Sequence, residues 1–242
     1  TSLPGQLFSI PALISGVSSN DIAPIVSGTP AALYGNWKGG AVSDDLKRVL
    51  TGNGVPTAVT TNASLPLTAP WTRSVTAFAV TNVPGAWGTD GLDFSHTSER
   101  LFSNIYGAVA PKIVTWDVVS LAGDGLALVT NTVFDTSVIR IRNVSAYYIG
   151  GKDLVYYGEG DTTGAGTTNK VCVYDPAEGT ETVLVSGLPR GSADADVMNV
   201  KVGGVGLGQM HLYVQLNNGA LYIYELGADG KSAGALSKSF SS

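Results

Sequence analysis

Hydrophobic residues in this 242-residue chain fall into short runs rather than long periodic stretches. The runs are rich in Val, Tyr, Ile, Leu and Phe, and clusters of Gly, Asn, Asp, Ser and Thr separate them. Short apolar runs bounded by turn-forming residues are typical of β-strands. Asp44 to Leu50 is also compatible with a helical turn, but Arg48 to Leu50 equally begins a strand. We therefore predict an all-β protein.

The hydrophobic runs belong to a sequence unit that occurs four times along the chain. Each unit has a short apolar strand, a polar turn, a charged residue and a second apolar strand. When Val49, Leu101, Leu154 and Leu212 are taken as equivalent positions, the units are spaced by 52, 53 and 58 residues. The units are Gly40–Leu50, Gly91–Phe102, Ala146–Tyr157 and, in degenerate form, Val200–Val214.

Further strands are predicted within each unit. In three units an acidic residue directly follows an aromatic one in the third strand: Trp116-Asp117, Tyr174-Asp175 and Tyr224-Glu225. The predicted third strands are Val75–Val80, Ile113–Val118, Val171–Asp175 and Ala220–Leu226, and the predicted fourth strands are Leu126–Thr130 and Thr180–Val185.

The clearest predicted hairpin is at Asn218-Gly219, where an Asn-Gly pair joins two alternating runs. Both residues of this pair readily adopt the positive φ angles that a type I′ turn requires. The sequence therefore predicts a type I′ turn at this point.

A period near fifty residues with three or four strands per unit matches a β-propeller blade, whose faces are buried by neighbouring blades. Gly91-Leu-Asp-Phe-Ser-His-Thr-Ser-Glu-Arg-Leu-Phe-Ser103 resembles the opening of blades in the TolB-like, NHL-like and gluconolactonase-like propeller families. His96-Thr97 replaces the usual turn pair. The resemblance covers roughly residues 35 to 226 and implies a propeller fold, but it says almost nothing about function.

We expect a single β-propeller-like domain over the whole chain. Residues 1–34 would form an N-terminal strand, a closing segment or a degenerate fifth blade. The structural alternative is a β-sandwich with long hairpins, which has no reason to repeat a three-strand unit at this interval. The four repeats are expected at approximately 35–85, 86–140, 141–192 and 193–242.

Charge is scarce: 14% of the residues are charged, against about 25% in a typical soluble domain. The net charge is −5 and the mean hydropathy is +0.19. Without a basic stripe, nucleic acid and anionic membrane surfaces are poor partners. Thr1 to Asn20 is uncharged, but prolines and glycines interrupt it, so we expect no membrane span. Low charge, Ser/Thr/Gly-rich loops and the lack of an initiator methionine favour a secreted or extracytoplasmic setting.

Few residues suggest catalysis. The single cysteine, Cys172, lies in an alternating strand and is expected to be a buried core thiol. His96 is expected to be a solvated turn residue and His211 a hydrogen-bonded structural histidine. Gly203–Gly208 superficially matches a phosphate-binding loop but lacks the strand-to-helix context. No arrangement of Ser, His and acid supports nucleophilic catalysis.

The acidic residues of the loops raise the question of calcium binding. Asp153, Glu159 and Asp161 lie close in sequence, as do Asp194 and Asp196, and hard cations bind several oxygen ligands. Neither group matches the twelve-residue calcium loop. We therefore expect no cofactor, with calcium as the less favoured alternative.

A candidate ligand site follows from the blade alignment. Residues that precede each innermost strand would gather at one mouth of the central channel, where aromatic rings beside amides and carboxylates suit sugars or small polar ligands. Packing of the tryptophans between blades is the alternative interpretation. The candidates are Asn36, Trp37, Trp87, Asp90, Asn143, Asp196 and Asn199.

Three functions remain open. The first is a non-catalytic extracytoplasmic module that binds a partner or assembles with itself, since charge is low and no catalytic constellation stands out. The second is a lectin-like propeller that binds surface glycans through Trp37 and Trp87. The third, implied by the gluconolactonase-like resemblance, is a metal-dependent hydrolase or lactonase using Asp90, Asp196 and Asn199. An acid near the start of the first blade, expected in those relatives, is not evident.

Overall fold

The chain folds into successive antiparallel β-sheets. The computed structural model describes residues 91–105, 111–120, 126–160, 169–188, 197–204 and 209–240, and before residue 91 the backbone of seven strands. No described residue is helical, so the all-β prediction is confirmed. Accordingly, the described part contains no helix long and apolar enough to span a membrane.

Each of the four main sheets is built from strands in chain order, as the repeat predicts. The first comprises β3 (Gly39–Val42), β4 (Arg48–Asn53), β5 (Val55–Thr61) and β6 (Arg73–Thr76). The second comprises β8 (Leu92–Phe94), β9 (Arg100–Ile105), β10 (Lys112–Ser120) and β11 (Leu126–Asp135), with β7 (Val80–Thr81) parallel to β11. The third comprises β12 (Ile141–Ile149), β13 (Lys152–Glu159), β14 (Asn169–Asp175) and β15 (Thr180–Leu188). The fourth comprises β16 (Val197–Gly204), β17 (Met210–Leu216), β18 (Leu221–Leu226) and β19 (Ala233–Phe240).

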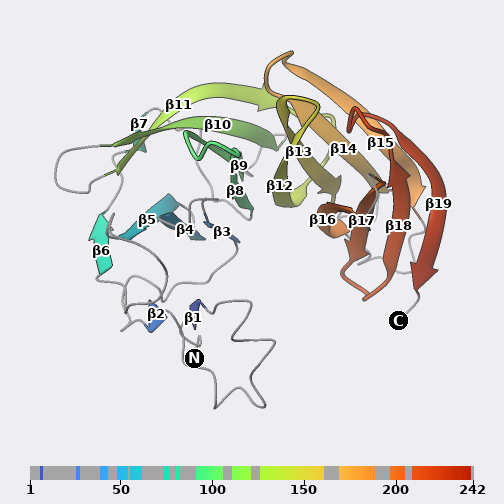
Figure 1. Cartoon of the computed structure of the whole chain (residues 1–242), viewed down its shortest axis with the longest axis horizontal. Coiled ribbons are helices and arrows are strands. Elements are labelled where there is room, and N and C mark those ends of the chain that lie inside the picture. Colours follow the sequence, from blue (N-terminus) through green and yellow to red (C-terminus); the bar gives the residue numbers. More distant parts are fainter. Residues whose placement is uncertain are drawn as a thin grey trace.

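The sheets follow one another along an arc, with the first and fourth sheets at its two ends (Figure 1). The first strands of consecutive sheets are neighbours, since β3 contacts β8, β8 contacts β12 and β12 contacts β16. Within the predicted N-terminal segment, β1 (Gln6–Leu7) and β2 (Val26–Ser27) form a separate two-stranded sheet. This radial arrangement is the one that the fifty-residue repeat predicts.

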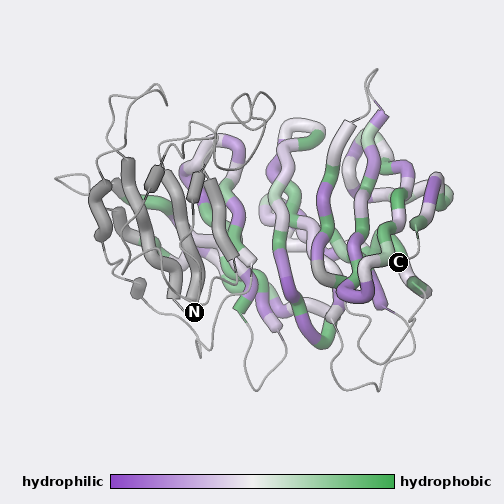
Figure 2. The backbone as a smooth tube through the Cα atoms, turned by 90° about the horizontal axis from the view of Figure 1, so that it is seen from below, coloured by the Kyte–Doolittle hydropathy of each residue, from purple (hydrophilic) through white to green (hydrophobic). Residues whose placement is uncertain are grey.

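Each inner sheet has two covered faces. We call the face toward the preceding sheet the leading face, and the face toward the next sheet the trailing face. On the trailing face of the second sheet, Phe102 and Ile113 pack with Val155 and Tyr157 of the third. On the trailing face of the third sheet, Tyr156 belongs to the apolar cluster that includes the leading face of the fourth. Figure 2 shows these sheets side by side, with hydrophobic and hydrophilic stretches interleaved along the strands.

Two covered faces explain why the second strands of the inner sheets are continuous hydrophobic runs. Leu154, Val155, Tyr156 and Tyr157 of β13 all have no exposed surface. A strand that is covered on both sides needs apolar residues at successive positions rather than at alternate ones. Burial of such large side chains is the dominant favourable contribution to folding, at about 1.5–3 kcal/mol for each aliphatic or Phe side chain.

Two sequence predictions about register and strand order are wrong. The third strand of the first sheet is β5, and the predicted strand Val75–Val80 is divided between the end of β6 and the start of β7. Pro56 and the small residues of β5 weaken its strand signal. Leu154 is not equivalent to Leu101 and Leu212, because it lies on the trailing face whereas they lie on leading faces. Val155 occupies the equivalent position in the third sheet.

The hairpin at Asn218-Gly219 is present, but its turn type differs from the prediction. Gly219 has a φ of 88° and its N–H donates to the carbonyl of Leu216, whereas Asn218 does not have a positive φ. The Asn218 side chain instead accepts a hydrogen bond from the N–H of Ala220. This local bond stabilises a conformation in which only the glycine is left-handed.

Candidate functional site

Two of the seven predicted site residues lie in the described part, and they contact each other. Asn143 of β12 donates from Nδ2 to Oδ1 of Asn199 of β16 at 2.6 Å, and both side chains are half-buried. The pair therefore links the first strands of the third and fourth sheets. The other five residues, Asn36, Trp37, Trp87, Asp90 and Asp196, lie outside the described residues.

A second polar bridge joins the same two strands. Lys201 of β16 donates from Nζ to Oγ of the buried Ser145 of β12 at 2.8 Å. Asn143 and Asn199 are 56 residues apart, and so are Ser145 and Lys201. The repeat thus places equivalent positions of neighbouring inner strands in contact. Asn143 also begins an Asn-Val-Ser triplet, which fits the acceptor pattern for N-glycosylation. Its amide nitrogen, however, is engaged in the bond to Asn199.

A carboxylate of the second sheet also bonds to the backbone of the third. Asp93 of β8 accepts through Oδ2 a hydrogen bond from the N–H of Ala146 at 2.8 Å. Burial raises the pKa of Tyr147, the backbone of Val202 opposes this, and the charge of Asp93 raises it further. The Asp93 bond satisfies a backbone donor of β12 and links the two sheets.

Asn104 forms a comparable link between the second and third sheets. Its Oδ1 accepts from the N–H of Gly91 at 2.6 Å, and its Nδ2 donates to the carbonyl of Ile141 at 3.0 Å. The side chain has no exposed surface. Sequence reasoning missed this residue because a lone Asn within an apolar strand gives no signal of its partner. Its burial among apolar neighbours in Leu101–Ile105 was the available clue.

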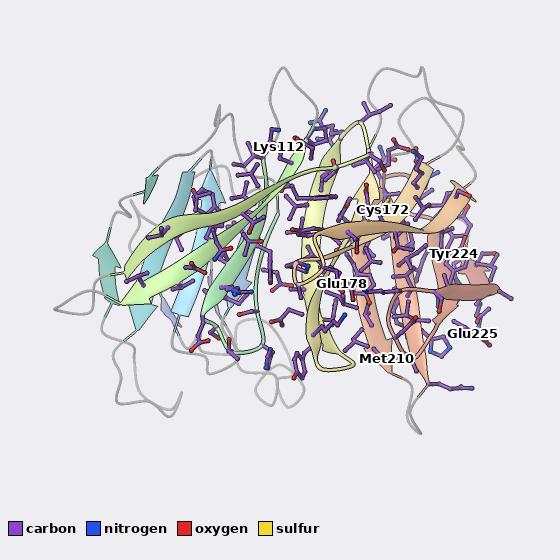
Figure 3. All side chains as sticks on the ribbon, turned by 90° about the horizontal axis from the view of Figure 1, so that it is seen from above. Lys112, Cys172, Glu178, Met210, Tyr224 and Glu225 are labelled. Carbon is purple, nitrogen blue, oxygen red and sulfur yellow. The ribbon has the colours of Figure 1, made fainter. Side chains whose placement is uncertain are left out.

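An ion-pair cluster joins the hairpins of the third and fourth sheets, and Figure 3 labels one of its members, Glu178. Asp175, only 1% exposed, lies 2.5 Å from Nζ of Lys231 and 3.2 Å from Nζ of Lys152. Both lysines also contact Glu178. Desolvation by burial tends to raise the pKa of Asp175, but hydrogen bonds from Lys231, Lys152 and two backbone amides outweigh it, so the pKa lies below its ordinary value. Nearby, the Tyr156 hydroxyl donates to the carbonyl of Gly230 at 2.8 Å.

His96 lies in a turn and is exposed, as predicted, but it also makes specific contacts with the third sheet. Its Nδ1 lies 3.1 Å from Oδ1 of Asp153, and its backbone N–H donates to the same oxygen at 3.0 Å. The ring also stacks on Tyr148 with centroids 3.7 Å apart. His96 therefore connects the β8–β9 turn to the third sheet, a contact between residues 57 positions apart that local sequence cannot reveal.

The structure places His211 and Cys172 away from any shared site. His211 lies in β17 opposite Glu225, and within the described part its Nδ1 is buried without a hydrogen-bond partner. Cys172 is fully buried in β14, as expected, and Figure 3 shows it inside the third sheet. Burial raises the pKa of its thiol and the nearby Glu181 raises it further, so the group stays a neutral core thiol.

Many polar side chains of the described inner strands bond from one sheet to the next. Within the described ranges, no three His, Cys, Asp or Glu side chains are grouped to hold a metal. Of the acids considered for calcium, Asp153 pairs with His96 and Glu159 accepts from the N–H of Ile139, while Asp161, Asp194 and Asp196 lie outside the described residues. Asp93, Asn104, Asn143, Ser145 and Asn199 all bond across sheets.

Comparison with known proteins supports the fold. No family model matches the chain, and neither does any curated protein. Among solved structures, the RRP9 WD40 repeats match with a TM-score of 0.51 at 13% identity, over 86% of this chain and 51% of that one. A putative 6-phosphogluconolactonase from Bacteroides uniformis matches with a TM-score of 0.50 at 12% identity, over 83% of this chain and 56% of that one. The chain thus spans about half the length of these structures, and the likeness shows that it has the β-propeller fold.

Proposed function

We propose that the chain is a non-catalytic, extracytoplasmic binding or assembly module built from propeller blades. The observation that carries this proposal is the pairing of polar side chains along the inner strands. Asn143 with Asn199 and Ser145 with Lys201 use their hydrogen-bonding groups to join neighbouring sheets. Groups engaged in this way hold the blades together rather than converging on a reacting atom.

The amino-acid composition supports the assembly role and the extracytoplasmic location in this proposal. A chain with 14% charged residues and a mean hydropathy of +0.19 leaves much neutral surface. Neutral surface suits a protein that packs against copies of itself or against another macromolecule. The Ser/Thr/Gly-rich loops and the low charge are the grounds for the extracytoplasmic part of the proposal.

A thermal-shift screen tests the function. The purified protein is heated with calcium, chelator, simple sugars and lactones, each at several protein concentrations. A ligand that binds only the folded state stabilises it by about 2.7 kcal/mol at a hundredfold excess over its dissociation constant. An assembly module predicts no ligand shift and a midpoint that rises with protein concentration.

The other outcomes would replace the proposal with a specific alternative. A shift with sugars that is lost in Trp37→Ala or Trp87→Ala would make the chain a glycan-binding propeller. Lactone turnover that is abolished by chelation and by Asp196→Ala would make it a metal-dependent lactonase. Either result would contradict a purely structural role.

A further inference from the structure

The trailing face of the fourth sheet differs from the other described trailing faces because no described sheet covers it. The pairing registers place Tyr213 opposite Ile223, and Leu221 opposite Gln215 and Phe240. We call Tyr213, Leu221, Ile223 and Phe240 the open face. The opposite side of the sheet, including Leu212 and Val214, is buried against the third sheet.

The open face is apolar at its centre and polar at its edges. Tyr213, Leu221 and Ile223 are half-buried, and Phe240 is 45% exposed. Exposed Gln215, Glu225 and Lys238 surround them, and Nζ of Lys238 lies 4.9 Å above the Phe240 ring. An apolar centre with a polar rim is the composition of a protein interface. Figure 3 places Tyr224 and Glu225 in this last sheet at the end of the arc.

The repeat identifies what kind of partner fits this face. Phe102 in β9 and Tyr156 in β13 project from the trailing faces of their sheets, and both are fully buried against the next sheet. Tyr213 holds the equivalent position in β17, because it pairs with Lys201 as Phe102 pairs with Asp93 and Tyr156 with Ser145. An aromatic anchor thus recurs on all three faces, and the first two are covered by the leading face of a blade.

The backbone register of the first sheet matches that of a leading face. Its register aligns Val42, Val49, Val59 and Val75 in one cross-strand row. Val42 ends its strand as Phe94 does in the second sheet, where the row of Phe94, Leu101 and Trp116 is buried on the leading side. The four valines therefore occupy the register positions that the leading row occupies in the second sheet.

We infer that the open face binds the first sheet of a second copy of this chain. Two copies would meet twice, each fourth sheet covering the other's first sheet, so that one two-fold axis closes the pair. The inference rests on the proposed assembly role and names its partner.

Sedimentation equilibrium of the 242-residue chain tests the inference. The wild type is expected to sediment as a dimer, and Ile223→Glu should raise the dissociation constant at least about 100-fold, because the carboxylate would be desolvated at the centre of both contacts. Val183→Glu is the matched control: Val183 is 47% exposed on the outer strand β15, and its replacement should leave the dimer intact. Leu221→Glu gives an independent second substitution on the open face.

The outcomes separate this inference from the proposed function. A wild type that is monomeric at all concentrations, a dimer that resists both Ile223→Glu and Leu221→Glu, or a ladder of larger species would overturn the closed pair. Thermal midpoints of the variants show whether each is still folded. The proposed function would fail by a different result, catalytic turnover, whereas a monomeric wild type would leave binding to another macromolecule in place.

Discussion

Two equivalent strands, β13 in the third sheet and β17 in the fourth, have different patterns of burial. Leu154 to Tyr157 of β13 are all buried, whereas β17 alternates between buried Leu212, half-buried Tyr213, buried Val214 and exposed Gln215. A strand covered on both faces is apolar throughout, and a strand covered on one face alternates. The difference shows that a blade of this protein is completed by its neighbour.

Substitution of the aromatic anchors should give the largest difference in stability between a covered face and the open face. Phe102→Ala should destabilise the fold by about 4 kcal/mol, because it leaves a cavity between the second and third sheets. Tyr213→Ala, in dilute protein, should cost about 1 kcal/mol, since Tyr213 is only half-buried within a single copy. Urea unfolding measures both. Equal losses would contradict the distinction between covered and open faces.

Replacement of a glycine at a contact between sheets should cause the next largest loss of stability. A Cβ at Gly91 would lie 2.4 Å from the backbone nitrogen of Val144 in the third sheet, so Gly91→Ala should cost about 3 kcal/mol. The control is Gly203→Ala on the trailing side of the fourth sheet, where the nearest atom is in the flexible Tyr213 ring at 3.3 Å. Thermal unfolding of Gly203→Ala should remain close to that of the wild type. A larger loss there than at Gly91 would argue against close packing of the second and third sheets.

The Asp175 cluster predicts how the contact between the third and fourth sheets depends on pH. Because the folded-state pKa of Asp175 is lowered, its stabilising effect is present above the unfolded-state pKa near 3.9 and is lost as the pH falls through the folded-state value. Asp175→Asn should cost about 2 kcal/mol at pH 7. The difference from the wild type should shrink below pH 4. Unfolding curves from pH 3 to 7 that stayed parallel would show that the carboxylate charge does not hold this contact.

The smallest effect is expected on the inner strands. Asn143→Ala removes the bond to Asn199, and a half-buried side-chain hydrogen bond contributes about 1 kcal/mol. Asn199→Ala should cost a similar amount, and the double variant should lose less than the sum, because each substitution removes the same bond. Strict additivity in chemical denaturation would show that the two amides act independently.

How far the sequence predicts this structure depends on the range of the interaction. Strand alternation and the fifty-residue repeat predict the sheets, because a blade is a local unit whose strands follow in order. The turn type at Asn218 differs from the prediction because an Asn side chain can bond to the backbone two residues on instead of adopting a positive φ. The alignment of Leu154 with Leu101 and Leu212 fails because β13 is apolar on both faces, so hydrophobic periodicity carries no information on its register.

The candidate site was only partly predictable for the same reason. Blade alignment placed Asn143 and Asn199 together at the inner strands, and the structure joins them. The links of His96 with Asp153 and of Asn104 with Ile141 cross between sheets over 57 and 37 residues. Nothing in the local sequence marks such pairs, because their geometry is fixed only when the sheets pack.

Oxidative footprinting of Tyr213 tests most directly whether a second copy covers the open face. Hydroxyl radicals modify exposed tyrosines, and Tyr148, which is 52% exposed on the third sheet, serves as the internal reference. As protein concentration rises, oxidation of Tyr213 should fall several-fold relative to Tyr148, and Ile223→Glu should abolish that protection. A Tyr213 that oxidises at the same relative rate at every concentration would contradict the account.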